Sequence, residues 1–136
     1  MKYCIKVVLY KKMCYTCQMH AKDVHKEISK LFARCNFPTK INGYIFLRDI
    51  VTLILSTEKN LTTSEWFYHV AEKHDVSIKN VERSIRTLIE NTWVKCYKLG
   101  LCKDHPTPRT YILMIAELIQ ENHAKSAPSA YDILLT

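Results

Sequence analysis

Side chains that can recognise nucleic acid gather in one short segment of the chain, directly after a serine that is well placed to begin a helix. The serine is Ser77, and the side chains are Lys79, Asn80, Glu82, Arg83 and Arg86. An arginine can donate two parallel hydrogen bonds to guanine, a glutamate can accept one from cytosine, and a lysine can meet a phosphate. On a helix, Lys79, Arg83, Arg86 and Glu90 fall within about 60° of one another. The segment is therefore a candidate nucleic-acid-reading surface, and the alternative is the solvated charged face of an ordinary helical hairpin.

Two helices are predicted to position this surface. Thr62 and Glu65 have the spacing of a capping box, which predicts a helix over 63–74. Ser77 can cap the next helix, predicted over 77–97. Helices of these lengths joined by a turn of three or four residues are typical of a helix-turn-helix.

The residues around the predicted turn suit that motif. Ala71 is small enough to let the two helices approach, Val76 is an apolar turn residue, and Val81 anchors the second helix. Asp75 stands where a glycine is usual, and aspartate tolerates a left-handed backbone better than most residues.

The remaining periodicity predicts three further helices, over 22–35, 43–56 and 108–123. Pro38 is expected to end the first, Asn42 can cap the second, and Thr107 with Pro108 predicts the start of the last. The helix over 43–56 is apolar on nearly all sides, so we expect it at the centre of the domain. The fold class is therefore all-α, with five to six helices including a helix-turn-helix.

Length and charge bound the alternatives. The 136 residues suit one domain, and only two glycines argue against a turn-rich β-sandwich or barrel. No apolar stretch approaches the length that spans a bilayer and the first residues do not form a signal peptide, so a soluble, cytoplasmic protein without a membrane partner is expected. The net charge of +7 resides in residues 1–40, which suits phosphate binding or a solubilising tail.

These patterns divide the chain into a basic N-terminal arm (1–22), a helical domain (23–124) and a C-terminal tail (125–136). Residues Tyr3 to Tyr10 alternate like a short strand. A lone strand must pair between chains, become a helical turn or stay mobile, and the sequence does not choose among these.

The cysteines raise the question of zinc. Cys14 and Cys17 have a C-x-x-C spacing, with His20 just downstream, and such a pair can hold one side of a tetrahedral site. A structural site needs a second pair, and the spacing of Cys96, Cys102 and His105 matches no ligand pattern. We therefore expect reduced thiols, no metal and no cofactor, and we expect Cys14 and Cys17 to be dispensable for folding.

Three runs of sequence resemble the C-terminal effector domain of the master response regulator of sporulation. They are Ile41-Asn-Gly-Tyr-Ile-Phe-Leu-Arg48, Val70-Ala-Glu-Lys-His-Asp75, and Val81-Glu-Arg-Ser-Ile-Arg86 with Ile89-Glu-Asn-Thr-Trp93. The similarity resumes at Pro106-Thr107 and along Tyr111-Ile-Leu-Met-Ile-Ala116, so it covers roughly residues 23–124. That family is an all-helical transcription-factor domain that reads a short promoter box.

The resemblance implies roles for several residues. Glu82 and Arg83 match the family's base-reading pair, and Arg86 matches a DNA-contacting arginine. Asn80 stands where the family more usually has arginine, and Asn42 matches the start of a helix whose amides could face a phosphate. By its position, Lys79 is expected to contact a phosphate.

The chain also departs from the family. Residues 1–22 are too few for a receiver domain and hold no acidic residue, so DNA binding independent of a phosphoryl donor is expected. The stretch from Trp93 to Pro106 is shorter than in the family, so the family's fifth helix is expected to be reduced or missing here. That segment lies near the surface through which family members pair on DNA, so an ordered dimer is not expected.

Two functions from different classes follow. The first is a sequence-specific regulator that binds double-stranded DNA and self-associates, if at all, on adjacent sites. The second is a protein-interaction module, a degenerate effector domain that modulates a related regulator without reading DNA. An enzyme with a small-molecule substrate is not expected, because His74 and Asp75 have no nucleophile placed near them and no glycine-rich phosphate loop is present.

Overall fold

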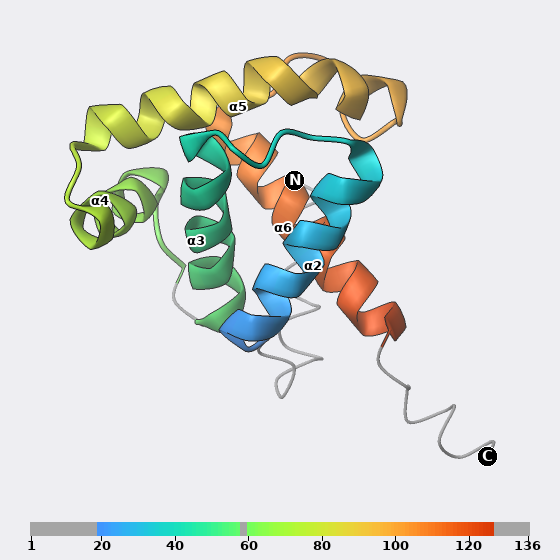
Figure 1. The fold of residues 1–136 in the computed structure, drawn as a ribbon, viewed down its shortest axis with the longest axis horizontal. Coiled ribbons are helices and arrows are strands. Elements are labelled where there is room, and N and C mark those ends of the chain that lie inside the picture. The colour runs from blue at the N-terminus through green and yellow to red at the C-terminus, as the bar shows by residue number, and fades with distance from the viewer. Residues whose placement is uncertain (1–18, 58–59, 127–136) are drawn as a thin grey trace.

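The computed structural model describes residues 19–57 and 60–126, and every regular element in these ranges is a helix. Figure 1 labels them in order as α2 (Ala21–Cys35), α3 (Asn42–Ser56), α4 (Thr63–His74), α5 (Ile78–Lys98) and α6 (Pro108–Ser126). The all-α prediction is confirmed, and each helix end lies within three residues of its predicted position. The alternating segment at Tyr3 to Tyr10 and the tail after Ser126 lie outside the described residues.

The central position predicted for α3 is confirmed, because α3 packs against each of the other described helices. In Figure 1 it runs through the middle of the molecule, with α5 across one end and α4 on the opposite side from α2 and α6. Its buried apolar side chains are Tyr44, Phe46, Leu47, Ile50, Val51 and Leu55. A helix surrounded in this way needs apolar residues on nearly every side, which is the pattern in the sequence.

The start of α3 differs from the prediction. Ile41, not Asn42, is the N-cap residue, and no side chain caps the helix; Asn42 is the first helical residue. The second helical residue, Gly43, is packed against the backbone of α5. A Cβ atom at Gly43 would lie 2.4 Å from the Ser84 carbonyl oxygen and 2.9 Å from Leu88 Cβ. This close approach holds the first turn of α3 against α5.

The end of α2 lies at Cys35, as predicted, but Pro38 is not what ends it. The helix ends at Cys35, and Asn36 takes a left-handed backbone with φ of 56°. The Phe37 amide then donates to the Phe32 carbonyl at 2.9 Å, so the last turn is closed before Pro38 is reached. Pro38 follows the stop and does not cause it.

The segment between Lys98 and Pro108 contains no helix and is held against α5. The Cys102 thiol donates to the Trp93 carbonyl at 3.8 Å, and the His105 ring lies against the Trp93 ring. The predicted cap of α6 is confirmed, because Thr107 Oγ1 accepts from the Thr110 amide at 3.3 Å. None of the helices in the described ranges combines the length and hydropathy needed to cross a membrane.

Candidate nucleic-acid interface

The capping box that begins α4 is formed as predicted. The Thr62 amide donates to Glu65 Oε1 at 3.0 Å, and the Glu65 amide donates to Thr62 Oγ1 at 3.2 Å. The bond from the Thr62 backbone, with a further one from its side chain, lowers the pKa of Glu65 below its ordinary value. The first helix of the motif is therefore fixed at its N-terminus by local sequence alone.

The turn between α4 and α5 depends on the left-handed residue predicted at its first position. Asp75 has φ of 54° and ψ of 49°. The Val76 amide reaches back to the Ala71 carbonyl at 3.0 Å, and this bond closes the end of α4. Ala71 and Val81 are buried and Val76 packs against the core, so all three play the parts that the sequence assigned to them.

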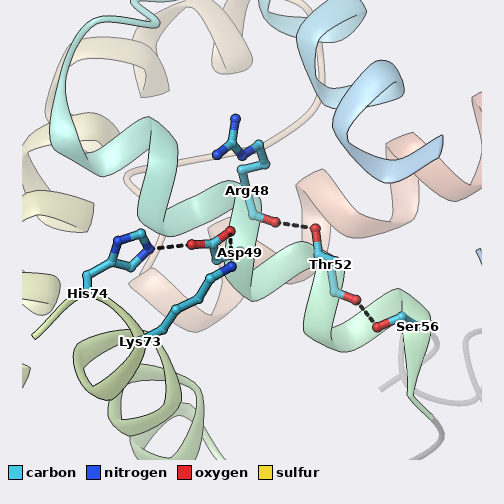
Figure 2. Close-up of polar contacts among 6 residues, drawn as sticks. All are labelled: Arg48, Asp49, Thr52, Ser56, Lys73 and His74. Atoms are coloured by element: carbon cyan, nitrogen blue, oxygen red, sulfur yellow. Dashed lines mark hydrogen bonds and ion pairs between the residues drawn. The ribbon is translucent and has the colours of Figure 1, made fainter. Parts of the chain in front are cut away.

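A buried carboxylate links the end of α4 to α3, and no sequence pattern predicted this contact. Asp49 of α3 has a side chain that is only 6% exposed, and it accepts from Lys73 Nζ at 3.3 Å and from His74 Nε2 at 2.5 Å. Figure 2 shows that both partners reach in from α4, while the neighbouring Arg48 side chain points away from Asp49. Thr52, the next polar residue of α3, bonds back to its own helix, at the Arg48 carbonyl.

This contact acts directly before the turn, because His74 is the last residue of α4. The His74 ring also lies edge-on to Phe46 of α3, with ring centroids 5.3 Å apart. Asp49 and His74 are 25 positions apart, so no local pattern could pair them. We call Asp49, Lys73 and His74 the α3–α4 latch.

The second helix of the motif begins as predicted at Ser77. Ser77 Oγ accepts from the Asn80 amide at 3.1 Å. Asn80 in turn uses its side-chain oxygen to accept from Ser84 Oγ at 3.3 Å. The cap leaves the first turn of α5 exposed, from Ile78 to Asn80.

Four of the predicted site residues share one face of α5. Lys79, Arg83 and Arg86 are exposed and Glu82 is partly so. Their side chains line a shallow, open depression, and the full set of lining residues is Lys79, Glu82, Arg83, Arg86, Thr87, Glu90 and Asn91. We call this set the reading face. Lys79, Arg83, Arg86 and Glu90, for which helical spacing predicts a common orientation, all belong to it.

Within the reading face, two residues already interact. Arg86 donates to Glu82 Oε1 from Nε at 3.2 Å and from Nη2 at 2.9 Å. At the far end, Glu90 is bonded to His105 of the following segment. Arg83 and Lys79 therefore contribute the positive charge that no carboxylate on this face offsets directly.

The two predicted asparagines lie apart from the reading face. Asn80 is exposed on the first turn of α5 but does not line the depression. Asn42 is exposed at the N-terminus of α3, next to Gly43, which touches the backbone of α5 at Ser84. The N-terminus of α3 is thus beside the reading helix, as a flanking phosphate contact would require.

The weak zinc candidates gain no support. Cys14 and Cys17 lie outside the described residues, and His20 is an exposed N-cap residue of α2. Burial raises the pKa of Cys96 to about 11, which disfavours the thiolate that a metal needs. Across residues 19–57 and 60–126, no three His, Cys, Asp or Glu side chains are grouped so that they could hold a metal.

One exposed apolar residue of α5 was not predicted. Ile78, the first residue of α5, is 44% exposed although Val81 and Ile85 on the same side of the helix are fully buried. The sequence does contain a signal for this exposure. Ile78 directly follows the N-cap Ser77, so it precedes the apolar stripe of α5 that packs in the core. Periodicity alone assigns it to the core.

Comparison with protein families gives one match. The model of the family described as "Sporulation initiation factor Spo0A C terminal" matches residues 28–119. The match includes the whole of α3, α4 and α5, and with them the reading face and the α3–α4 latch. No solved structure matches the chain.

Proposed function

The chain belongs to the Spo0A C-terminal family of sporulation initiation factors, and from this premise we propose that it is a sequence-specific transcriptional regulator that reads a short promoter box with α5. The family is one of DNA-binding effector domains and not a catalytic one. Double-stranded DNA is accordingly the partner at the level of the family.

The observation that carries the proposal is the reading face itself. It presents cationic and acidic side chains on the exposed side of the second helix of a helix-turn-helix, the helix that such motifs place in the major groove. Arg83 has no carboxylate bonded to it and can grip guanine O6 and N7. Lys79, one turn nearer the N-terminus, can meet a phosphate.

Glu82 and Arg86 are proposed to act as a pair. In the structure the Arg86 guanidinium donates twice to one oxygen of Glu82, which leaves the second oxygen able to accept from cytosine N4. The same contact restrains both side chains before DNA arrives, which lowers the entropy lost on binding. Arg86 is then available to a neighbouring base or phosphate with its remaining donors.

The N-terminus of α3 is proposed as a flanking phosphate contact. Its cap residue, Ile41, satisfies none of the first amides of the helix through a side chain. Free amides at a helix N-terminus favour an anion. Because Gly43 holds this end against α5, a phosphate bound near Asn42 would be close to the groove that α5 enters.

A second candidate function is favoured by the polar contacts of the first two turns of α5. The Asn80 side chain already accepts a hydrogen bond from Ser84, and the Glu82 side chain already accepts one from Arg86. Neither side chain therefore needs a base as a hydrogen-bond partner. The alternative is a protein-interaction module that modulates a related regulator without reading DNA.

Selection of bound sites from a random double-stranded DNA pool tests the two candidates. A reading helix enriches one short sequence. Binding to that sequence weakens as the salt concentration rises, because the cationic side chains displace counterions from the phosphates. Comparable binding of every pool sequence, or none, would favour the interaction module. Competition at fixed salt between the enriched site and a scrambled version of it then measures the discrimination.

A further inference from the structure

An apolar side chain stands in solvent at the end of the row of base-reading residues. Ile78 is 44% exposed at the first position of α5, whereas Val81 and Ile85, which continue the same side of the helix, are 0% exposed. α4 ends at His74, before α5 begins, and residues 78–80 of the first turn of α5 are exposed. Ile78 thus projects from the part of a recognition helix that enters the groove first.

Ile78 also lies on the same ridge as the proposed base readers. Residues four apart on a helix are neighbours, so Ile78, Glu82 and Arg86 form one continuous row. The row is apolar at its N-terminal end and polar from Glu82 onward, where Arg86 bonds to Glu82. Ile78 therefore lies one helical turn from Glu82 on the same ridge of α5.

The major groove offers one apolar group for such a side chain, the C5 methyl of thymine. We propose that Ile78 packs against the methyl group of a thymine in the target site and so determines specificity at that position. The inference rests on the proposed function, because it requires α5 to lie in the major groove. Four residues of helix rise about 6 Å, which places the thymine about two base pairs from the one that Glu82 reads.

The side chain suits this role for a further reason. Isoleucine is branched at Cβ and has one strongly preferred χ1 rotamer in a helix, so little side-chain freedom is lost when it meets the methyl. Burying one methyl group is worth about a fourfold change in affinity. That sets the size of the effect to look for.

Deoxyuridine substitution tests the inference, because uracil lacks only the thymine methyl and pairs in the same way. In the enriched site each thymine is replaced in turn, and the affinity of the full chain is measured. We expect one position at which the replacement weakens binding by about fourfold. In Ile78→Ala the same replacement should have no effect, and Ile78→Val should retain part of it.

Val94→Ala is the matched control, since Val94 is 46% exposed on the same helix but four turns further along. It should show the full uridine effect. Two results would overturn this inference alone. One is a protein that enriches a site but binds it equally well with deoxyuridine at each thymine position. The other is an Ile78→Ala variant that loses as much affinity on deoxyuridine substitution as the parent. A protein that enriches no site would overturn the proposed function and this inference with it.

Discussion

In the first two turns of α5, the reading face has two cations, Lys79 and Arg83, and one carboxylate, that of Glu82. Glu82→Gln keeps its shape and removes its charge. We expect affinity for all DNA to rise, because one repulsion from the phosphates is lost. Discrimination at the cytosine position should fall, and the preference should shift toward adenine, which an amide recognises; such contacts are worth about 1–3 kcal/mol. Competition binding with sites that differ at one base pair measures both effects.

Glu90→Gln is the matched control for this prediction. Glu90 lines the same face but is bonded to His105, two turns beyond Glu82. It should raise the general affinity in the same way and leave the sequence preference unchanged. A loss of discrimination equal to that of Glu82→Gln would show that charge, and not base recognition, is what Glu82 provides.

Single residues were predictable from the sequence where their role is local. The capping box at Thr62 and the left-handed Asp75 depend on neighbours within a few positions, and both predictions were confirmed. The cap at Asn42 was predicted wrongly, because α3 begins one residue earlier and Ile41 is its N-cap. The contact of Gly43 with α5 could not be predicted, because the residues it meets are more than forty positions away. Asp49 could not be predicted for the same reason, since its partners are on another helix.

At the scale of elements, the packing of α3 against α5 depends on the absence of a side chain at Gly43. Gly43→Ala would place a Cβ atom 2.4 Å from the backbone carbonyl of Ser84, and a backbone cannot move aside as a flexible side chain can. We expect the free energy of unfolding to fall by about 1–3 kcal/mol, the usual cost of overpacking. Urea denaturation followed by circular dichroism measures it.

Asn42→Ala, one position earlier, provides the comparison. Asn42 is exposed and its side chain makes no cap bond, so its loss should change stability by less than about 0.5 kcal/mol. Equal stability of the Gly43→Ala protein and the parent would mean that α3 and α5 do not approach as closely as described.

The α3–α4 latch is expected to stabilise the helix-turn-helix locally. Asp49→Asn removes the negative charge that both Lys73 and His74 contact. The Lys73 and His74 side chains can still bond to water. We expect a loss of about 1–3 kcal/mol, the range for a buried hydrogen-bonded group that loses its partner. Hydrogen exchange should be fastest to respond at the Val76 amide, whose bond to Ala71 closes the end of α4.

Lys73→Gln separates the two arms of the latch. The Lys73 side chain is 63% exposed, so its ion pair should contribute little, below about 1 kcal/mol. Unchanged exchange at Val76 in Asp49→Asn would contradict the assignment of the latch to the turn.

The helices themselves were largely predictable, because apolar spacing and caps are local signals. The long apolar stripe predicted α3 at the centre, and the structure places it there. Which helices touch, and through which atoms, was not predictable. The latch and the contact at Gly43 belong to that second class, and so does the exposure of Ile78, which depends on where α4 stops.

For the whole molecule, the expected stoichiometry on DNA follows from one reading face per chain. We predict that the protein binds a single box as a monomer and that two chains meet only on adjacent boxes. Each chain then neutralises the same number of phosphates, so the salt dependence per bound protein should be equal on single-box and double-box DNA. Sedimentation of the protein alone, combined with titrations at several salt concentrations, measures this. A tight dimer in the absence of DNA would contradict it.

The family and the fold class were predictable at this scale because the reading helix and its neighbours carry the most specific part of the resemblance, and the family match covers them. The division into an arm, a domain and a tail stays a prediction.

The central claim is that the exposed side of α5 reads base sequence, and the ratio of affinities for the enriched and the scrambled site tests it most directly. Arg83→Ala and Lys79→Ala each remove one cation from the same face, so they differ only in the role assigned to them. We predict that Arg83→Ala lowers the ratio by a factor corresponding to about 1–3 kcal/mol, while Lys79→Ala weakens binding to both sites equally. An Arg83→Ala protein that keeps the parent's ratio would contradict the claim.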